Sequence, residues 1–156
     1  MGNRAVITAC KNKEPQCTYD IGVYLHWYGG RDSVEAILAY CEAKGYRAPD
    51  TDCYGWARLC QVIGNTLGGT LSVGIDCCKW LDCDNGDNGT YIISGWAIVD
   101  RKYFDGVEQD ASEELFYEFL KQINDHQPEA ERLDDETLKN AAEKRWHVWH
   151  DKEEQA

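Results

Sequence analysis

The order of strand-like and helix-like segments is the feature that most restricts how this chain can fold. Two segments rich in β-branched and aromatic residues come first, and two segments with apolar residues at helical spacing follow them. Two further strand-like segments and two further helical segments complete the chain. The strand-like ranges are 4–10, 21–28, 70–75 and 91–99, and the last two helices begin at Ser112 and Asp134.

This order, ββααββαα, lacks the regular strand–helix alternation that is typical of a parallel doubly wound sheet. We therefore expect an α+β fold, in which an antiparallel sheet of about four strands carries four helices on a face. The polar segment 11–20 contains Pro15 and is predicted to be a loop that lets the first two strands pair antiparallel. Asn85-Gly86 and Asn88-Gly89 tolerate positive φ, so we also expect a hairpin between 70–75 and 91–99.

Residues at the ends of the helical segments indicate where the helices begin and end. Asp32 is followed three positions later by Glu35, which is the arrangement of a capping box, so the first helix should begin there. Gly45 is placed to end that helix in the left-handed conformation, and Gly68-Gly69 closes the second. The acidic segment Asp134-Asp135-Glu136 should open the fourth helix, since carboxylates favour the positive end of the helix dipole.

Length and composition predict one globular unit. We expect a single α+β domain over 1–133, with an acidic C-terminal helix over 134–156 that packs on it and frays at its end. Hydrophobic residues make up 43% of the chain and aromatic residues 12%, which is enough for a core, so the acidity does not predict disorder. No stretch approaches the roughly 18 apolar residues of a membrane span, which predicts a soluble, cytoplasmic protein.

The negative charge is concentrated in the second half of the chain. Residues 1–76 hold 8 Asp and Glu against 7 Lys and Arg, whereas residues 77–156 hold 20 against 9. Such a field repels nucleic acid and attracts basic surfaces, and salt should weaken that attraction. We therefore expect a basic protein partner and no direct binding to nucleic acid or membrane.

Carboxylates recur every few residues in the distal part, between apolar positions that anchor helices. Held on a rigid surface, they could imitate a row of phosphates and occupy a nucleic-acid groove on another protein. The alternative is an ordinary solubilising surface. The candidate partner-binding residues are Glu108, Asp110, Glu113, Glu114, Glu118, Asp134, Asp135 and Glu136.

A second group of residues could bind a small ligand. The glycine turn at 29–30 leads into a helix start, which can hold an anion, and aromatic residues nearby could stack on a base. A tight turn with a capped helix explains the same residues without a ligand, and Asp32 would repel a phosphate. The candidates are His26, Arg31, Tyr54, Trp56 and Arg58.

No motif in the chain predicts catalysis or a metal. The cysteines lack the paired Cys-x2-Cys spacing of zinc sites, and the acidic residues of 82–87 lack the glycine and glutamate positions of a calcium loop. There is no nucleophile elbow and no phosphate-transfer set. Cys41 and Cys60 fall on apolar helix faces, where a free cysteine is a small buried hydrophobe. We expect no catalytic residue, no metal and no cofactor.

Several blocks of the chain resemble a group of short, uncharacterised proteins of phages and mobile elements in gut and lactic bacteria. The resemblance covers most of residues 1–105 and carries no assigned chemistry. It implies a context, since small acidic phage proteins often look like counter-defence factors, including inhibitors of CRISPR nucleases. The blocks are 2–8, 22–46 with Tyr24-Leu25-His26-Trp27, Tyr54-Gly55-Trp56-Ala57-Arg58, and 68–76.

These observations favour a non-enzymatic inhibitor whose acidic helices block a basic nucleic-acid groove of a host defence protein in the bacterial cytoplasm. One alternative is a module that sequesters a nucleotide signal between the turn at 29–30 and the Tyr54-Trp56 cluster. A less favoured alternative is an enzyme that acts on such a nucleotide. The sequence leaves a homodimer open.

Overall fold

The computed structural model of the chain describes residues 3–9, 20–69, 71–108 and 112–155, with side chains as far as Asp151. Strands and helices follow one another in the order ββααβββαα, which confirms the α+β class. The elements are β1 (Ala5–Ala9), β2 (Ile21–Leu25), α1 (Arg31–Ala43), α2 (Cys53–Leu67), β3 (Val73–Cys77), η1 (Cys78–Trp80), β4 (Thr90–Ser94), β5 (Ala97–Lys102), α3 (Glu113–Asp125), η2 (Glu129–Glu131) and α4 (Asp135–Gln155).

The five strands form one mixed sheet in the order β3-β2-β1-β4-β5. β2 pairs antiparallel with β1, as predicted, and also with β3. β1 and β4 run parallel, in the register Val6↔Thr90 to Ala9↔Ile93. The sheet therefore has one strand more than the predicted number of about four, and the parallel pairing of β1 with β4 corrects the expectation of a purely antiparallel sheet.

The hairpin predicted between 70–75 and 91–99 is also wrong. β3 pairs with β2, whereas β4 pairs with β1, so the two segments lie on opposite sides of the sheet centre. The range 91–99 instead contains a turn at Gly95, where φ is +62°, and it divides into the antiparallel hairpin β4–β5. Glycine adopts this conformation without a steric cost. The apolar alternation on both sides of Gly95 had concealed the turn.

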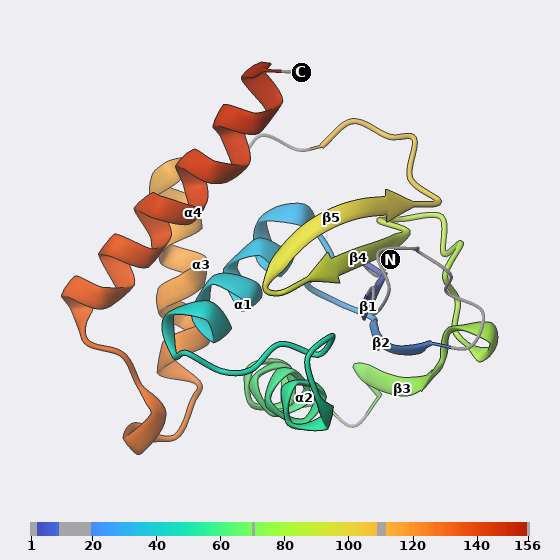
Figure 1. Ribbon diagram of the computed structural model, residues 1–156, viewed down its shortest axis with the longest axis horizontal. Coiled ribbons are helices and arrows are strands. Elements are labelled where there is room, and N and C mark those ends of the chain that lie inside the picture. The colour runs from blue at the N-terminus through green and yellow to red at the C-terminus, as the bar shows by residue number, and fades with distance from the viewer. Residues whose placement is uncertain (1–2, 10–19, 70, 109–111, 156) are drawn as a thin grey trace.

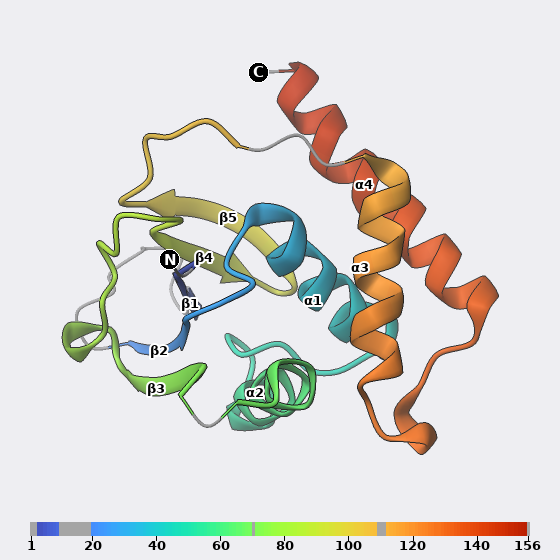
Figure 2. The same ribbon diagram turned by 180° about the vertical axis from the view of Figure 1, so that it is seen from behind.

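The helices cover one face of the sheet, with α1 between the sheet and the pair α3–α4 (Figures 1 and 2). Nine consecutive residues of α1, Ser33 to Cys41, are buried, because the helix is enclosed on all sides. The core joins Ile7, Val23 and Tyr91 of the sheet to residues of all four helices. Cys41 lies in this core as predicted, and Cys60 packs against it, partly buried.

The predicted capping box at the start of α1 is wrong. The N-cap is Gly30, without a side-chain cap bond, and the Asp32 carboxylate accepts a hydrogen bond from the neighbouring Ser33 amide at 2.8 Å. Glu35 is buried at 3% exposure, and its carboxylate lies between the guanidinium groups of Arg31, at 3.6 Å, and Arg145 of α4, at 3.4 Å, without capping a backbone amide. A buried partner far along the chain therefore outweighs the local cap.

The other predicted helix ends are confirmed. Gly45 follows α1 at φ +74°, and Gly68 ends α2 at φ +64°. The hydroxyl of Ser112 caps α3 by accepting from the Leu115 amide at 3.1 Å, and Asp134 precedes α4.

The other face of the sheet is covered by the connector between β3 and β4, residues 78–89. β1 is consequently buried on both faces, with Val6 fully buried and Thr8 at 1% exposure. A Cβ on Gly22 would lie 2.8 Å from Leu81 of the connector, so the backbone approaches closely here. The buried Asn85 organises the turn, since its side-chain oxygen accepts hydrogen bonds from the amides of Asp87, Asn88 and Gly89.

Candidate functional site

The carboxylates predicted to bind a partner lie mostly on α3 and α4, which form an antiparallel helical hairpin (Figure 2). We call residues 112–151 the acidic hairpin. Its helices run in opposite directions, so their acidic first turns lie at opposite ends, about 18 Å apart for a helix of this length. Glu113, Glu114 and Glu118 are exposed at one end, and Asp134, Asp135 and Glu136 at the other.

The inner side of the acidic hairpin is fixed to the rest of the molecule. Phe116 and Leu138 are fully buried. The rings of Phe116, Trp146 and Trp149 contact one another, with centroids 5.7 to 6.0 Å apart. Because such aromatic packing restricts both helices, the backbone positions that carry the outer carboxylates are fixed.

A buried arginine also holds α4 against the core. The Arg145 guanidinium is 7% exposed, donates a hydrogen bond to the Trp96 carbonyl at 2.8 Å, and lies 3.4 Å from the Glu35 carboxylate. Burial raises the pKa of Glu35, and the charge of Arg145 opposes that rise. A charge buried in this way requires its partner to remain in place.

The predicted carboxylates differ in how far the protein itself already uses them. Glu108 forms an ion pair with Arg101, and Asp134 accepts a hydrogen bond from the Thr137 amide at 2.7 Å, which lowers the pKa of Asp134. Asp110 lies outside the described residues. Within the described part of the chain, no ion pair involves the remaining five, which are Glu113, Glu114, Glu118, Asp135 and Glu136.

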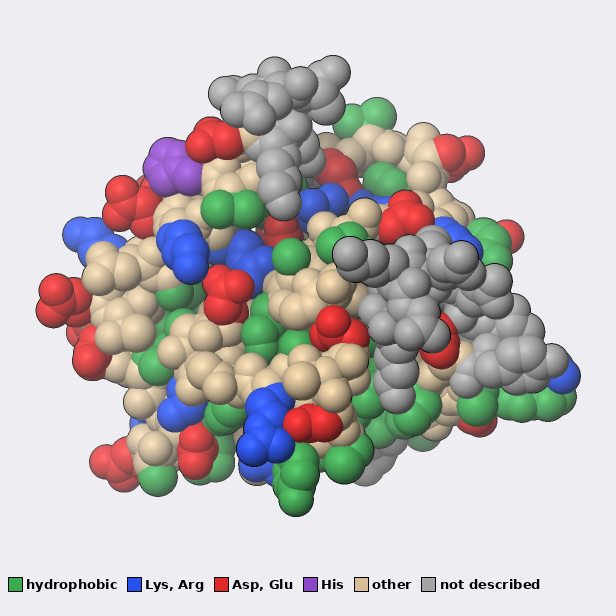
Figure 3. All heavy atoms as spheres, viewed as in Figure 1, with side chains coloured by type: hydrophobic (Ala, Val, Ile, Leu, Met, Phe, Trp, Pro, Cys, Tyr) green, Lys and Arg blue, Asp and Glu red, His purple; other side chains and the backbone are tan. Residues whose placement is uncertain are grey.

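A groove of about 310 Å³ runs between the first turn of α3 and the middle of α4. Glu113 and Glu114 line it from α3, and Glu143 and Lys139 line it from α4. Three carboxylates against one ammonium favour a basic side chain as the occupant. In Figure 3, acidic side chains also follow the margin where α4 lies, with Lys and Arg between them.

The residues predicted to bind a small ligand fall at two separate places. Arg31 begins α1, close to the C-terminal end of α2, since Thr66 of α2 lines the same small pocket as Tyr28 and Ser33. Tyr54 lies in the first turn of α2, about 18 Å from Thr66 along the helix. The structure therefore does not bring Arg31 together with Tyr54.

Tyr54, Trp56 and Arg58 stay close to one another at the start of α2. Tyr54 is 63% exposed and contacts the Arg47 guanidinium, whose carbon lies 5.4 Å from the ring centre. Trp56 packs against the core, and Arg58 is exposed to solvent. The interpretation of Trp56 as a core residue accounts for its position.

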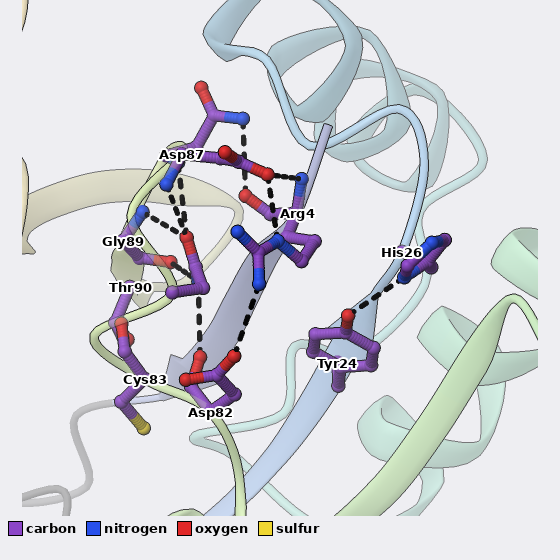
Figure 4. Close-up of polar contacts among 10 residues, drawn as sticks. Arg4, Tyr24, His26, Asp82, Cys83, Asp87, Gly89 and Thr90 are labelled. Carbon is purple, nitrogen blue, oxygen red and sulfur yellow. Dashed lines mark hydrogen bonds and ion pairs between the residues drawn. The ribbon is translucent and has the colours of Figure 1, made fainter. Parts of the chain in front are cut away.

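His26 belongs to a polar group on the connector side of the sheet (Figure 4). Its Nδ1 lies 2.9 Å from the Tyr24 hydroxyl. Nearby, the Arg4 guanidinium lies between two carboxylates, 2.8 Å from Asp87 and 3.5 Å from Asp82. The hydrogen bonds from Arg4 lower the pKa of Asp87. This ion pair holds the connector onto the start of β1.

A cleft of about 570 Å³ opens at the start of α1, which is a volume typical of small-ligand sites. Arg31 lines it, but its Nε is buried 3.6 Å from the Glu35 carboxylate, and its guanidinium carbon lies 5.5 Å from the centre of the Trp149 ring. Phe104 and Phe119 supply apolar walls, and the amide side chains of Asn3 and Asn88 supply polar groups. Sequence reasoning missed these four, because they come from segments that only the fold brings together.

The cleft is also lined by carboxylates, two of which are neutralised inside the protein. Asp87 pairs with Arg4, and Glu108 pairs with Arg101. The Arg101 guanidinium is further held between two rings, 4.3 Å from the centre of Tyr91 and 3.6 Å from that of Phe104. Asp32 is the carboxylate of the cleft that still opposes an anionic ligand.

The described residues contain no group of three or more His, Cys, Asp or Glu side chains that could hold a metal ion. Burial raises the pKa of the Cys41 thiol and that of the Cys60 thiol. A thiol in such surroundings stays protonated and is a poor nucleophile.

Comparison with protein-family models, with curated proteins and with solved structures finds no match to this chain. The resemblance to phage and mobile-element proteins therefore stays a hypothesis. Among the described helices, none combines the length and the apolar character needed to cross a membrane.

Proposed function

We propose that this chain is a non-enzymatic inhibitor of phage or mobile-element origin, which binds the basic nucleic-acid groove of a host defence protein through its acidic hairpin. The observation that supports the proposal is the set of five carboxylates without ion pairs on helices whose inner side is packed into the core. Because the helices that carry the carboxylates are already held by the core, binding of a basic surface orders only the exposed side chains, and the loss of conformational entropy is limited to them.

The arrangement of these carboxylates suits a nucleic-acid groove. The two acidic ends of the hairpin are about 18 Å apart, which corresponds to about five base-pair steps of a duplex. Each end would replace a separate group of phosphates, and the groove beside Glu113 and Glu143 would accept an arginine or lysine of the partner. The host protein would then be unable to hold its nucleic acid.

The test is a matched pair of charge reversals, measured against a panel of purified RNA-guided nucleases. Changing Glu113, Glu114 and Glu118 to Lys should slow association at least tenfold, because steering depends on the charge of the interface. Changing Asp84, Asp100 and Asp105 to Lys alters the net charge equally but leaves the hairpin unchanged, and it should have a much smaller effect. These control residues are exposed and lie outside the hairpin.

Two results would reject this function. One is a complex that survives the hairpin reversal unchanged, and the other is an inhibitor that binds alongside the target duplex instead of competing with it. Lys in the first turn of α3 also opposes the helix dipole, so the same positions should be tested as Gln and the unfolding of each variant measured.

A second candidate function is the binding of a nucleotide signal in the cleft at the start of α1. The volume of the cleft, the guanidinium of Arg31, which also pairs with Glu35, and the two phenylalanine walls favour it. A cyclic dinucleotide or ADP-ribose should then raise the melting temperature, and Arg31→Gln should abolish the rise. Arg58→Gln is the control, since Arg58 lies on α2 and does not line the cleft. If the protein converted a molar excess of the nucleotide to product over time, it would be an enzyme instead of a binding module.

A further inference from the structure

The sheet has two edge strands, β3 and β5, and they differ in how they are protected against pairing with another strand. Edge strands expose backbone groups that can extend a sheet, and proteins usually block them with bulges and charged side chains. β5 has both, since its pairing with β4 shifts register between Ile92 and Ile93, and its second half reads Asp100-Arg101-Lys102.

β3 has little of this protection. It is regularly paired with β2 from Val73 to Cys77, without a register shift. Its sequence, Val-Gly-Ile-Asp-Cys, contains one charged residue and no proline. Ile75 is 58% exposed at its centre, and apolar side chains flank the strand, with Leu71 at 90% and Trp80 at 71% exposure. Figure 3 shows hydrophobic side chains on the side where β3 and η1 lie in Figure 1.

The hydrogen bonds at the two ends of β3 determine which backbone groups face outward. The His26 amide donates to the Ser72 carbonyl, and the Cys78 amide donates to the Asp20 carbonyl. Residues alternate along an antiparallel ladder, so Gly74 and Asp76 direct their backbone groups toward β2. The backbone groups of Val73, Ile75 and Cys77 consequently point away from the sheet. Within the described part, the Asp76 carboxylate accepts the Cys77 amide at 2.7 Å, and no partner is found for the outward amides of Val73 and Ile75.

We propose that a second copy of this chain pairs with β3 along this edge, antiparallel and centred on Ile75, so that two five-stranded sheets join into one. In this register Ile75 faces its own copy, Val73 faces Cys77, and Gly74 faces Asp76. The carboxylate of each copy therefore lies opposite a glycine, and no like charges are directly opposed. A strand that is compatible with itself in this way suits a symmetric partner.

The distribution of charge supports a second copy as the occupant. Two chains of net charge −12 repel each other, and the repulsion is weakest where the surface is neutral. Residues 71–81 contain one Asp and one Lys, so β3 and its flanks are balanced, and the acidic hairpin lies at the far end of the molecule (Figure 1). Pairing through β3 therefore keeps the two acidic hairpins away from each other.

The experiment is sedimentation velocity of the full chain, with a reducing agent present, over about a hundredfold range of concentration. The wild type should form a concentration-dependent dimer. Ile75→Lys should weaken the dimer at least tenfold, because it places two ammonium groups face to face. Val99→Lys is the matched control, since Val99 is 56% exposed on β5, and it should leave the dimer unchanged.

A charge swap tests the register itself. Gly74→Asp places a carboxylate opposite Asp76 of the other copy and should weaken the dimer several-fold, whereas Gly74→Lys should tighten it. A side chain is tolerated at Gly74, because a Cβ there would lie 3.8 Å from Tyr24, at ordinary contact distance. A wild type that stays monomeric, or a dimer that survives Ile75→Lys, overturns the proposal. Equal responses to Asp and Lys at position 74 overturn the register.

Discussion

The acidic hairpin and the β3 edge lie at opposite ends of the molecule and present opposite kinds of surface. The hairpin, residues 112–151, carries 11 Asp and Glu against 5 Lys and Arg, whereas residues 71–81 carry one of each sign. The hairpin hides its aromatic residues inside, with Phe116 fully buried, while the β3 end leaves Leu71, Ile75 and Trp80 exposed. The β3 end thus combines balanced charge with three exposed apolar side chains, whereas the hairpin combines a large negative charge with two exposed aliphatic side chains, Leu115 at 55% and Val148 at 45%.

The partners proposed for the two ends would be recognised by different physical means. A charged surface acts over about 8 to 10 Å at ordinary salt and mainly sets the rate of encounter. An apolar strand edge acts only on contact, through backbone hydrogen bonds and buried area. The two interactions can therefore be altered independently, by mutation and by salt.

The largest expected effect comes from releasing the hairpin from the core. Arg145→Met leaves Glu35, at 3% exposure, without its main counter-charge, and it should destabilise the fold by about 3 to 5 kcal/mol. Urea unfolding measures the loss. Hydrogen exchange should show faster exchange in α4, and β3 should be little changed.

The control for Arg145 is its neighbour in sequence. The Lys144 side chain is 72% exposed and lies 3.8 Å from Glu42, so Lys144→Met should change stability by less than about 0.5 kcal/mol. Replacing both Glu35 and Arg145 with apolar residues should recover much of the loss, since the buried carboxylate is removed together with Arg145, and Arg31, whose side chain is 21% exposed, is the remaining charge that loses its contact with Glu35. Equal losses in the single and double variants would mean that packing, and not charge, holds α4.

Salt should change the binding of the acidic hairpin and the β3 dimer differently, and this effect is expected to be smaller than that of Arg145→Met. Raising the ionic strength from about 0.05 to about 0.5 M should slow the association of the hairpin with a basic partner roughly tenfold. The same change should leave the β3 dimer unchanged or tighten it, because it screens the repulsion between two acidic chains. Stopped-flow association and sedimentation measure the two effects. If added salt weakened both the hairpin complex and the β3 dimer, the idea that one end binds through charge and the other through apolar contact would be contradicted.

The smallest expected effect is a pH dependence of stability at the connector that follows β3. Arg4 holds the pKa of Asp87 below its ordinary value, so this pair stabilises the fold above about pH 3.9. The contribution is lost as the pH falls through the lowered pKa. Asp87→Asn should therefore cost less than about 1 kcal/mol at neutral pH, and the difference from wild type should vanish in acid.

Asp84→Asn is the matched control for the pH experiment, because Asp84 is exposed in the same connector and forms no ion pair with any residue that the structure describes. Thermal unfolding of the three proteins between pH 2 and 7 provides the comparison. A constant difference between wild type and Asp87→Asn at every pH would contradict the role given to Arg4.

The sequence predicted most of the local structure, because local signals determine it. The glycines at 45 and 68 and the cap at Ser112 lie where the helices end or begin. Pairing between distant strands was less predictable. Apolar alternation indicates a strand but not its neighbour, so the parallel contact of β1 with β4 and the turn at Gly95 were missed.

The candidate site shows the same limit. The exposed carboxylates of α3 could be placed from the sequence, since an amphipathic helix determines which residues face solvent. The buried pair of Arg145 with Glu35 could not, because both residues read as ordinary surface charges until α4 packs on α1. The cleft beside Arg31 draws on segments more than one hundred residues apart, from Asn3 to Phe119.

The parallel pairing of β1 with β4 has a consequence for synthesis. The strand Ala5–Ala9 has one of its two neighbours in Thr90–Ser94, so it cannot be enclosed until the chain has been synthesised as far as β4, about eighty residues later. Such long-range closure is a slow step in folding. During this interval the apolar strand β1 lacks its neighbour, and the nascent chain is then most exposed to chaperones and to aggregation.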